Sequence, residues 1–117
     1  MHIISILKIK MSKENFCPLQ LTMNLIGTKW KPLVLFHLLD GPLRSGILQK
    51  HIADISNKMF TQTVRELEQD GLISRKIFPV VPPKVEYELT AKGMSLENIL
   101  RSLDQWGSSV RNEENRL

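Results

Sequence analysis

The sequence SNKMFTQTVRELEQDGLISRKIFPVVPPKVEYELT, residues 56–90, decides the fold. Phe60, Val64 and Leu67 recur at intervals of four and three residues, which places them on one face of a helix that can pack against a core. The serine that opens the stretch is a favourable N-cap, and Gly71 is a natural C-terminal cap. We therefore expect a helix that begins after this serine and ends at about residue 70.

Two strand-like segments follow this helix, residues 72–78 and 85–89. The second alternates apolar and acidic side chains, which is typical of a strand with one covered face. Three prolines lie between the two segments. Because proline cannot donate a hydrogen bond to a β ladder, they mark an extended tip. The two segments predict a β hairpin, the wing of a winged helix.

The polar face of the predicted helix offers hydrogen-bond donors rather than balanced ion pairs. Its members are Asn57, Lys58, Thr61, Gln62 and Arg65. Arginine or lysine can pair with guanine and glutamine with adenine, and a helix of this size fits the major groove. The wing adds Arg75, Lys76 and Lys84, which we expect to hold phosphates or to probe the minor groove. The alternatives are a solvated helix surface and ordinary strand charge.

The distribution of charge agrees with a nucleic-acid partner. The net charge of +4 is a weak indication by itself. Residues 44–84, however, contain seven basic and four acidic side chains, whereas residues 85–117 contain four basic and six acidic ones. The positive charge therefore accompanies the predicted helix and wing, as a surface that contacts phosphates requires.

Three helices are predicted upstream, over about residues 18–26, 28–39 and 46–52. The second is apolar nearly all round, which is typical of a central helix. The third is short, and we expect it to turn Ile47 and its other apolar side chains inward. Together with the helix that begins after residue 56, it forms a helix-turn-helix.

A long helix capped by Thr90 is expected to end the domain. Its apolar side chains recur at three- and four-residue intervals: Leu96, Ile99, Leu103, Trp106 and Val110. So small a domain has little to cover such a stripe, so we interpret the stripe as a dimer interface. The predicted fold class is mainly α with a small antiparallel β hairpin (α+β), a winged helix-turn-helix with N- and C-terminal dimerisation helices.

With 117 residues the chain has the size of one domain. We divide it into an N-terminal extension (1–15), the winged helix-turn-helix domain (16–111) and a C-terminal tail (112–117). The extension is either a dimer arm or a non-native segment, since Met11 offers a second start. A single cysteine permits no internal disulfide, and no apolar run approaches about 20 residues, so we expect a cytoplasmic protein without a membrane span.

No enzyme chemistry is indicated. His2, His37 and His51 are scattered, and neither a second cysteine nor a carboxylate cluster completes a metal site. No nucleophile–base pair and no phosphate-binding glycine loop is present. The sequence therefore predicts no metal, no cofactor and no catalytic activity.

Three segments carry a family resemblance: CPLQLTMNLIGTKWKPLVLFHLLDGP, ISNKMFTQTVRELEQDGLISRKIF and VPPKVEYELTAKG. In order and spacing they resemble the HxlR family of bacterial transcriptional regulators, winged-helix proteins related to the MarR group. The resemblance covers about residues 16–107 and implies a homodimer that binds double-stranded DNA at a pseudo-palindromic operator. Two positions depart from the family pattern, Ser45-Gly46 in place of an aromatic residue and Asn57 in place of a proline.

Cys17 is a candidate sensor. It precedes a helix-opening proline, and the positive end of a helix favours a thiolate. The resemblance implies that a cysteine at this motif position can sense oxidants, quinones or aldehydes, so an oxidant or small-molecule effector is a further expected partner. The alternative is a small buried core residue.

A second function class stays open, a winged helix that serves as a protein–protein interaction module without specific DNA readout. Such modules tend to lose the basic residues of the recognition helix or to carry an apolar patch there. Lys58 and Arg65 therefore favour the DNA-binding regulator.

Overall fold

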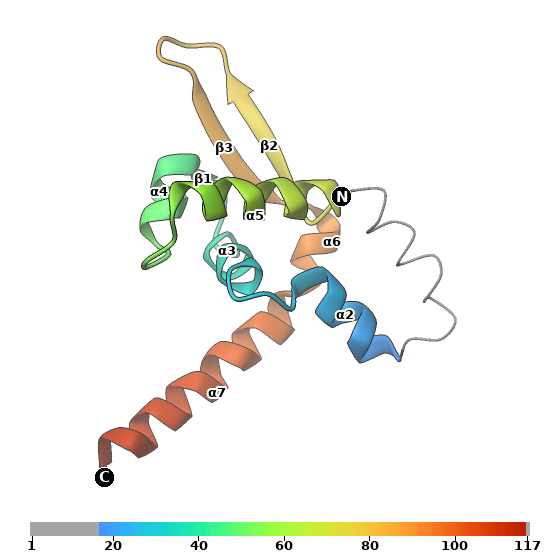
Figure 1. Cartoon of the computed structure of the whole chain (residues 1–117), viewed down its shortest axis with the longest axis vertical. Helices are drawn as coiled ribbons and strands as arrows, with labels where there is room; N and C mark the ends of the chain where they lie inside the picture. The colour runs from blue at the N-terminus through green and yellow to red at the C-terminus, as the bar shows by residue number, and fades with distance from the viewer. Residues whose placement is uncertain (1–16, 117) are drawn as a thin grey trace.

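The computed structural model describes residues 17–116 (Figure 1). The elements in chain order are α2 (Pro18–Ile26), α3 (Lys31–His37), β1 (Leu43–Arg44), α4 (Ser45–Lys50), α5 (Asn57–Gln69), β2 (Ile73–Phe78), β3 (Lys84–Leu89), α6 (Ala91–Met94) and α7 (Glu97–Arg116). The predicted fold class, mainly helical with a small antiparallel sheet, is confirmed. The predicted extension, residues 1–15, lies outside the described residues.

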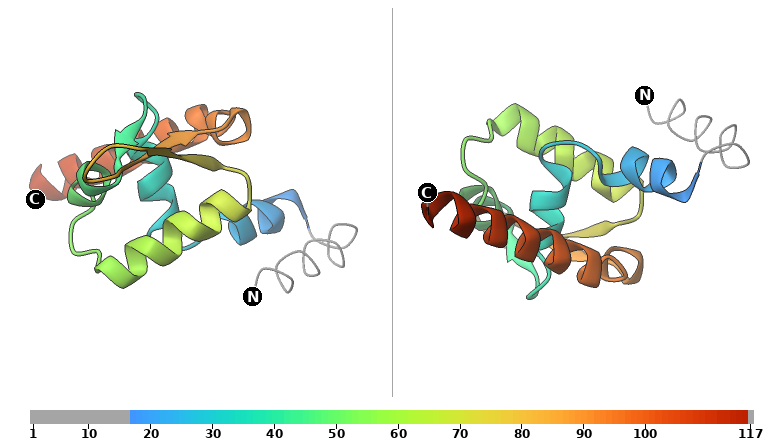
Figure 2. Two further views of the ribbon diagram at one scale, coloured as in Figure 1. Left: turned by 90° about the horizontal axis from the view of Figure 1, so that it is seen from above. Right: turned by 90° about the horizontal axis from the view of Figure 1, so that it is seen from below.

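Helix α3 is the centre of the core. It lies between α5 and α7 (Figures 1 and 2), and its Val34 and Leu35 are completely buried. The predicted inward stripe of α5, Phe60, Val64 and Leu67, is 0–3% exposed. Burial of each such side chain contributes roughly 1.5–3 kcal/mol, so packing against α3 fixes which face of α5 remains in solvent.

The wing is part of a three-stranded antiparallel sheet rather than an isolated hairpin. The strand order is β1–β3–β2, and in β1 Leu43 pairs with Tyr87 and Arg44 with Glu86. The prediction missed β1, because two residues are too few to show an alternating pattern. Its pairing with β3 joins the wing to the start of α4.

The prediction that Ile47 of the short helix turns inward is wrong. Ile47 is 47% exposed, whereas Leu48 and Ile52 are 0% and 4% exposed. Leu48 faces the core, and its neighbour Ile47 lies about 100° away around the helix, while Ile52 is buried just after the helix ends.

The expected long last helix is two helices. Thr90 caps only α6, where its side-chain oxygen accepts a hydrogen bond from the Gly93 N–H at 3.1 Å. The chain turns at residues 95–96 before α7 begins, and Leu100 of α7, which the prediction omitted, is 2% exposed in the core. Helix α7 continues to Arg116, past the predicted domain end at residue 111.

Within residues 17–116 no helix is both long and apolar enough to cross a membrane.

Candidate nucleic-acid interface

The outer face of α5 displays the polar row that the sequence predicted. Its start is fixed by Ser56, whose Oγ accepts a hydrogen bond from the Met59 N–H at 3.1 Å. The inner face, with Phe60, Val64 and Leu67, is buried. All five predicted recognition residues are exposed: Asn57, Lys58, Thr61, Gln62 and Arg65. Packing on one side of α5 therefore presents these side chains together on the other.

A helix-to-helix contact sets the orientation of Asn57. The Gln49 Nε2 of α4 donates a hydrogen bond to the Asn57 Oδ1 at 2.5 Å. One of the two lone pairs of the Asn57 Oδ1 is thereby used, and its Nδ2 group remains a donor. A two-bond pair with adenine would have to share the Oδ1 with Gln49, whereas a phosphate or a guanine edge needs only the donor, so this geometry favours a phosphate or a guanine edge as the partner of Asn57.

The two glutamates of α5 form ion pairs with basic residues of neighbouring elements. The Glu66 Oε1 lies 3.5 Å from the Nζ of Lys31 on α3, and the lysine side chain is only 8% exposed. The Glu68 Oε2 lies 3.7 Å from the Nε of Arg75 on β2. One pair joins α5 to the core and the other joins it to the wing.

The structure separates the predicted wing residues. Arg75 pairs in register with Tyr87, whereas its neighbour Lys76 pairs with Glu86. Because side chains alternate between faces along a strand, Lys76 lies on the opposite face from Arg75, with its Nζ 4.9 Å from the ring centre of Phe78. Arg75 is thus the wing cation that faces α5.

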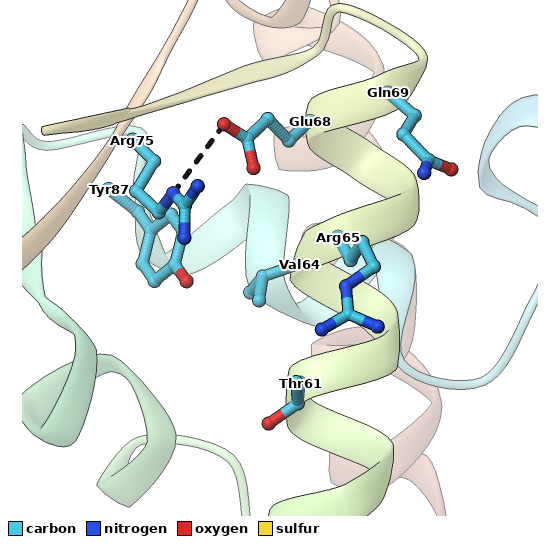
Figure 3. A pocket seen from close by; sticks show the side chains of 7 residues that line it. All are labelled: Thr61, Val64, Arg65, Glu68, Gln69, Arg75 and Tyr87. Carbon is cyan, nitrogen blue, oxygen red and sulfur yellow. Dashed lines mark ion pairs between the residues drawn. The ribbon is translucent and has the colours of Figure 1, made fainter.

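Two adjoining hollows lie against the sheet, the first beside α5 and the second beside the start of α4, and we call them together the wing groove. Its first part is a cavity of about 300 Å³ lined by Thr61, Val64, Arg65, Glu68, Gln69, Arg75 and Tyr87 (Figure 3). Its second part, about 370 Å³, is lined by Arg44, Ser45, Gly46, Arg75, Pro83, Lys84, Val85 and Tyr87.

Arg75 and Tyr87 line both parts of the wing groove. Four basic residues border the groove, of which Arg65 and Arg75 share a cavity with Tyr87, and Glu68 is the acidic residue among them. Arg44 and Tyr87 were not among the predicted site residues. The run of basic residues could have pointed to Arg44, but only the pairing of β1 with β3 brings it beside the wing.

Tyr87 holds a buried position between the core and the groove. It is 7% exposed, and its ring meets that of Phe60 edge-on with 6.3 Å between ring centres. Burial raises the pKa of the Tyr87 hydroxyl, and the nearby Arg75 opposes this increase. The hydroxyl therefore stays protonated at neutral pH and can donate a hydrogen bond.

A second surface runs along α7 and α3. Ile99, Leu103 and Trp106 are 47%, 55% and 70% exposed, and Val110 is partly buried. Leu96 differs from the rest of the predicted stripe, because it packs against the core. Beside the stripe lies an apolar cavity of about 190 Å³ lined by Pro32, Leu33, Phe36, Leu100, Leu103 and Asp104. α7 extends away from the other elements (Figure 1), so this surface is open.

The remaining titratable candidates lie apart from α5's outer face. Cys17 is exposed at the N-cap of α2, which does not fit the alternative of a buried core thiol. His37 stacks on His51 with 5.2 Å between ring centres. Burial lowers the pKa of His37, and His51 lowers it further. Among the residues that the structure describes, no three potential ligands gather as a metal site.

A helix-turn-helix whose second helix is flanked by a β wing defines the winged-helix class of proteins. The profile of the HxlR-like helix-turn-helix family matches residues 25–115. The chain belongs to this family, which confirms the predicted resemblance.

Relatives agree over most of the chain. It is 48% identical over 102 residues to YkvN of Bacillus subtilis, described as an uncharacterized HTH-type transcriptional regulator, with 87% of this chain and 86% of YkvN covered. The redox regulator HypR in its oxidized form is 41% identical with a TM-score of 0.76, over 80% of this chain and 96% of HypR. The reduced transcriptional regulator YodB of B. subtilis is 35% identical with a TM-score of 0.67, over 78% of this chain and 90% of YodB.

Proposed function

We propose that this protein is a DNA-binding transcriptional regulator that acts in the cytoplasm as a homodimer on a pseudo-palindromic operator. The observation that carries the proposal is the exposed polar row on α5, which lies beside a cavity lined by Arg65 and Arg75. Membership of the HxlR-like family supports it. We assign the chain no enzymatic role, since the relatives named above are regulators.

The recognition residues differ in what they can read. Arg65 can pair with the two acceptors of guanine, and Gln62 can pair with adenine. Asn57 offers a donor, because Gln49 occupies its oxygen. Lys58 and Arg75 suit phosphates, which position a protein on the duplex without reading its sequence.

Dimerisation would use the open apolar surface of α7. Ile99, Leu103 and Trp106 are large side chains left in solvent by the single chain, and α3 contributes Leu33, which is 40% exposed. A two-fold pair would present two copies of α5 to half-sites one helical turn, about 34 Å, apart. A change in the packing of α7 would change this spacing and hence the affinity for the operator.

We further propose that Cys17 makes DNA binding responsive to oxidants. Its thiol is exposed at the start of α2, where an adduct or a mixed disulfide can form. HypR and YodB, both similar to this chain, are described in reduced and in oxidized or diamide-treated forms. The test compares operator binding of Cys17→Ser and the parent before and after diamide, and equal loss of binding in both would contradict the sensor role.

DNA recognition is tested by selecting bound sequences from a random pool and titrating the selected duplex against salt. Affinity should fall steeply with salt, because binding releases counterions from the phosphates. Arg65→Ala should weaken binding and relax the preference at one base pair, with a loss of roughly 1–3 kcal/mol. Arg111→Ala is the matched control. It removes the same charge from an exposed residue of α7, outside the proposed DNA-binding surface.

The competing function, a protein-interaction module, makes the opposite prediction. Absence of any duplex binding at low salt would favour it. Unchanged affinity and base preference in Arg65→Ala would instead show that the outer face of α5 had been assigned wrongly.

A further inference from the structure

We infer that the wing groove seats one phosphate of the DNA backbone and that the Tyr87 hydroxyl is the hydrogen-bond donor at its floor. The inference rests on the proposed DNA-binding function and deepens it, because it assigns a contact to a buried residue of the sheet. This phosphate belongs to the DNA strand that passes between α5 and the wing.

The first observation is the position of the hydroxyl. The Tyr87 ring is held by its edge-on contact with Phe60 and by strand pairing opposite Arg75. Its oxygen points into the space between the sheet and α5 (Figure 3), and Tyr87 lines the cavity there. The hydroxyl lines the groove on a ring held in place by its packing, so an acceptor that enters the groove meets a donor that is already positioned.

The second observation is the charge around this hydroxyl. Arg65 of α5 and Arg75 of β2 line the same cavity as Tyr87. Arg44 and Lys84 border the adjoining hollow, although strand alternation places them on the opposite face of the sheet from Arg75 and Tyr87. The carboxylate in the groove, that of Glu68, is already paired with Arg75. A protonated phenol between guanidinium groups fits an oxyanion that accepts several charge-assisted hydrogen bonds at once, as a phosphate does.

The third observation identifies the source of the phosphate. Thr61 and Arg65 line the groove and also belong to the exposed recognition row. If α5 enters the major groove and the wing tip reaches the adjacent minor groove, the backbone between the two grooves must cross this hollow. The ligand is therefore a phosphodiester of the bound duplex rather than a free anion.

Tyr87→Phe tests the inference, because it removes only the hydroxyl and keeps the ring that contacts Phe60. We would measure Kd by fluorescence anisotropy on the selected operator and on duplexes with one methylphosphonate, placed at each backbone position in turn. The variant should bind the unmodified operator about tenfold more weakly, as expected for a lost hydrogen bond to a charged group. At one methylphosphonate position the parent and the variant should bind equally, since the oxygen that Tyr87 contacts has lost its charge.

Ser74→Ala is the matched control. It removes an exposed hydroxyl from β2, in register with Glu88 on the opposite face from Arg75, and should leave affinity unchanged. Equal melting temperatures of the parent and both variants would show that the loss is not one of folding. No loss in Tyr87→Phe, or the same loss at every methylphosphonate position, would overturn the inference while leaving the DNA-binding function intact.

A free anion is excluded by titrating the DNA-free parent with inorganic phosphate and with benzoate while following the Tyr87 resonances by NMR. We expect neither anion to cause a saturable change in the Tyr87 resonances at millimolar concentration. Saturation by either anion would assign the groove to a soluble ligand and overturn the inference. If the parent itself binds no duplex with salt dependence, the proposed function fails together with the inference.

Discussion

Glu66 and Lys31 join the predicted recognition helix α5 to the central helix α3, and Glu66→Gln should cost about 2 kcal/mol of folding stability. The Nζ–Oε1 distance is 3.5 Å. The substitution leaves a lysine whose side chain is 8% exposed without its counter-charge. An uncompensated buried charge is more costly than the loss of an exposed ion pair.

The magnitude follows from the distance and the solvent exposure. At 3.5 Å, two unit charges attract by about 1 kcal/mol in water and by about 5 kcal/mol at the effective dielectric constant of about 20 that describes protein sites. Lys31 is shielded from water, but the Glu66 side chain is 43% exposed. Glutamine also keeps an oxygen that can accept a hydrogen bond from the ammonium. The expected loss of folding stability therefore lies in the lower half of the range from about 1 to about 5 kcal/mol.

Urea denaturation measures the effect. The unfolding midpoint should fall at an unchanged denaturant slope, and the melting temperature should fall by roughly 10 °C for a domain of this size. Glu68→Gln is the matched control on the same helix, because its partner Arg75 is 46% exposed and such pairs contribute about 0.2–1 kcal/mol.

A double variant tests whether the loss of stability comes from the buried lysine charge that Glu66→Gln leaves unpaired. Lys31→Met combined with Glu66→Gln removes the buried charge as well, so it should recover most of the stability lost in Glu66→Gln alone. If Glu66→Gln and Glu68→Gln were equally stable, or if Lys31→Met gave no recovery, the ion pair would not be what holds α5 against α3.

Three further predictions concern single contacts. Gly93→Ala should lower the melting temperature by several degrees or prevent folding, because an added Cβ would lie 2.1 Å from the carbonyl oxygen of Leu72. Gln49→Glu should reverse the Asn57 amide, since a carboxylate can only accept; the side chain would then present its oxygen, and the pool-selected operator should change at one base pair toward adenine or cytosine. Burial lowers the pKa of His37 below 6.5, so the unfolded chain binds more protons than the folded one just below that pH. Stability measured in urea should therefore decrease as the pH falls through about 6.5, and His37→Gln should flatten this dependence.

Gln69→Glu is the control for Gln49→Glu. It also adds one negative charge, but on α5 rather than α4 and without contacting Asn57. It should weaken binding uniformly, with no change in base preference. The same operator change in both variants would mean that charge, and not the orientation of Asn57, altered the selection.

The sequence by itself determined the elements and their class. The stripe Phe60, Val64 and Leu67, the Ser56 cap and the prolines of the wing tip are local signals, because helix and strand periods and backbone restrictions act over a few residues. The same periodicity placed the five recognition residues on the exposed side of α5. Periodicity gave the wrong result at Ile47 and at the break between α6 and α7. At these places the packing of Leu48 and Leu100 in the core decides which residue turns inward.

Only the tertiary structure decided which of these side chains meet. Gln49 reaches Asn57 because of the angle between α4 and α5, and Lys31 reaches Glu66 because α5 packs across α3. The pairing of β1 with β3 sets Arg44 opposite Glu86 and Leu43 opposite Tyr87, a residue that the sequence pattern showed only as an apolar strand position. These contacts join residues of different helices and strands, and their geometry depends on the packed core rather than on any local pattern.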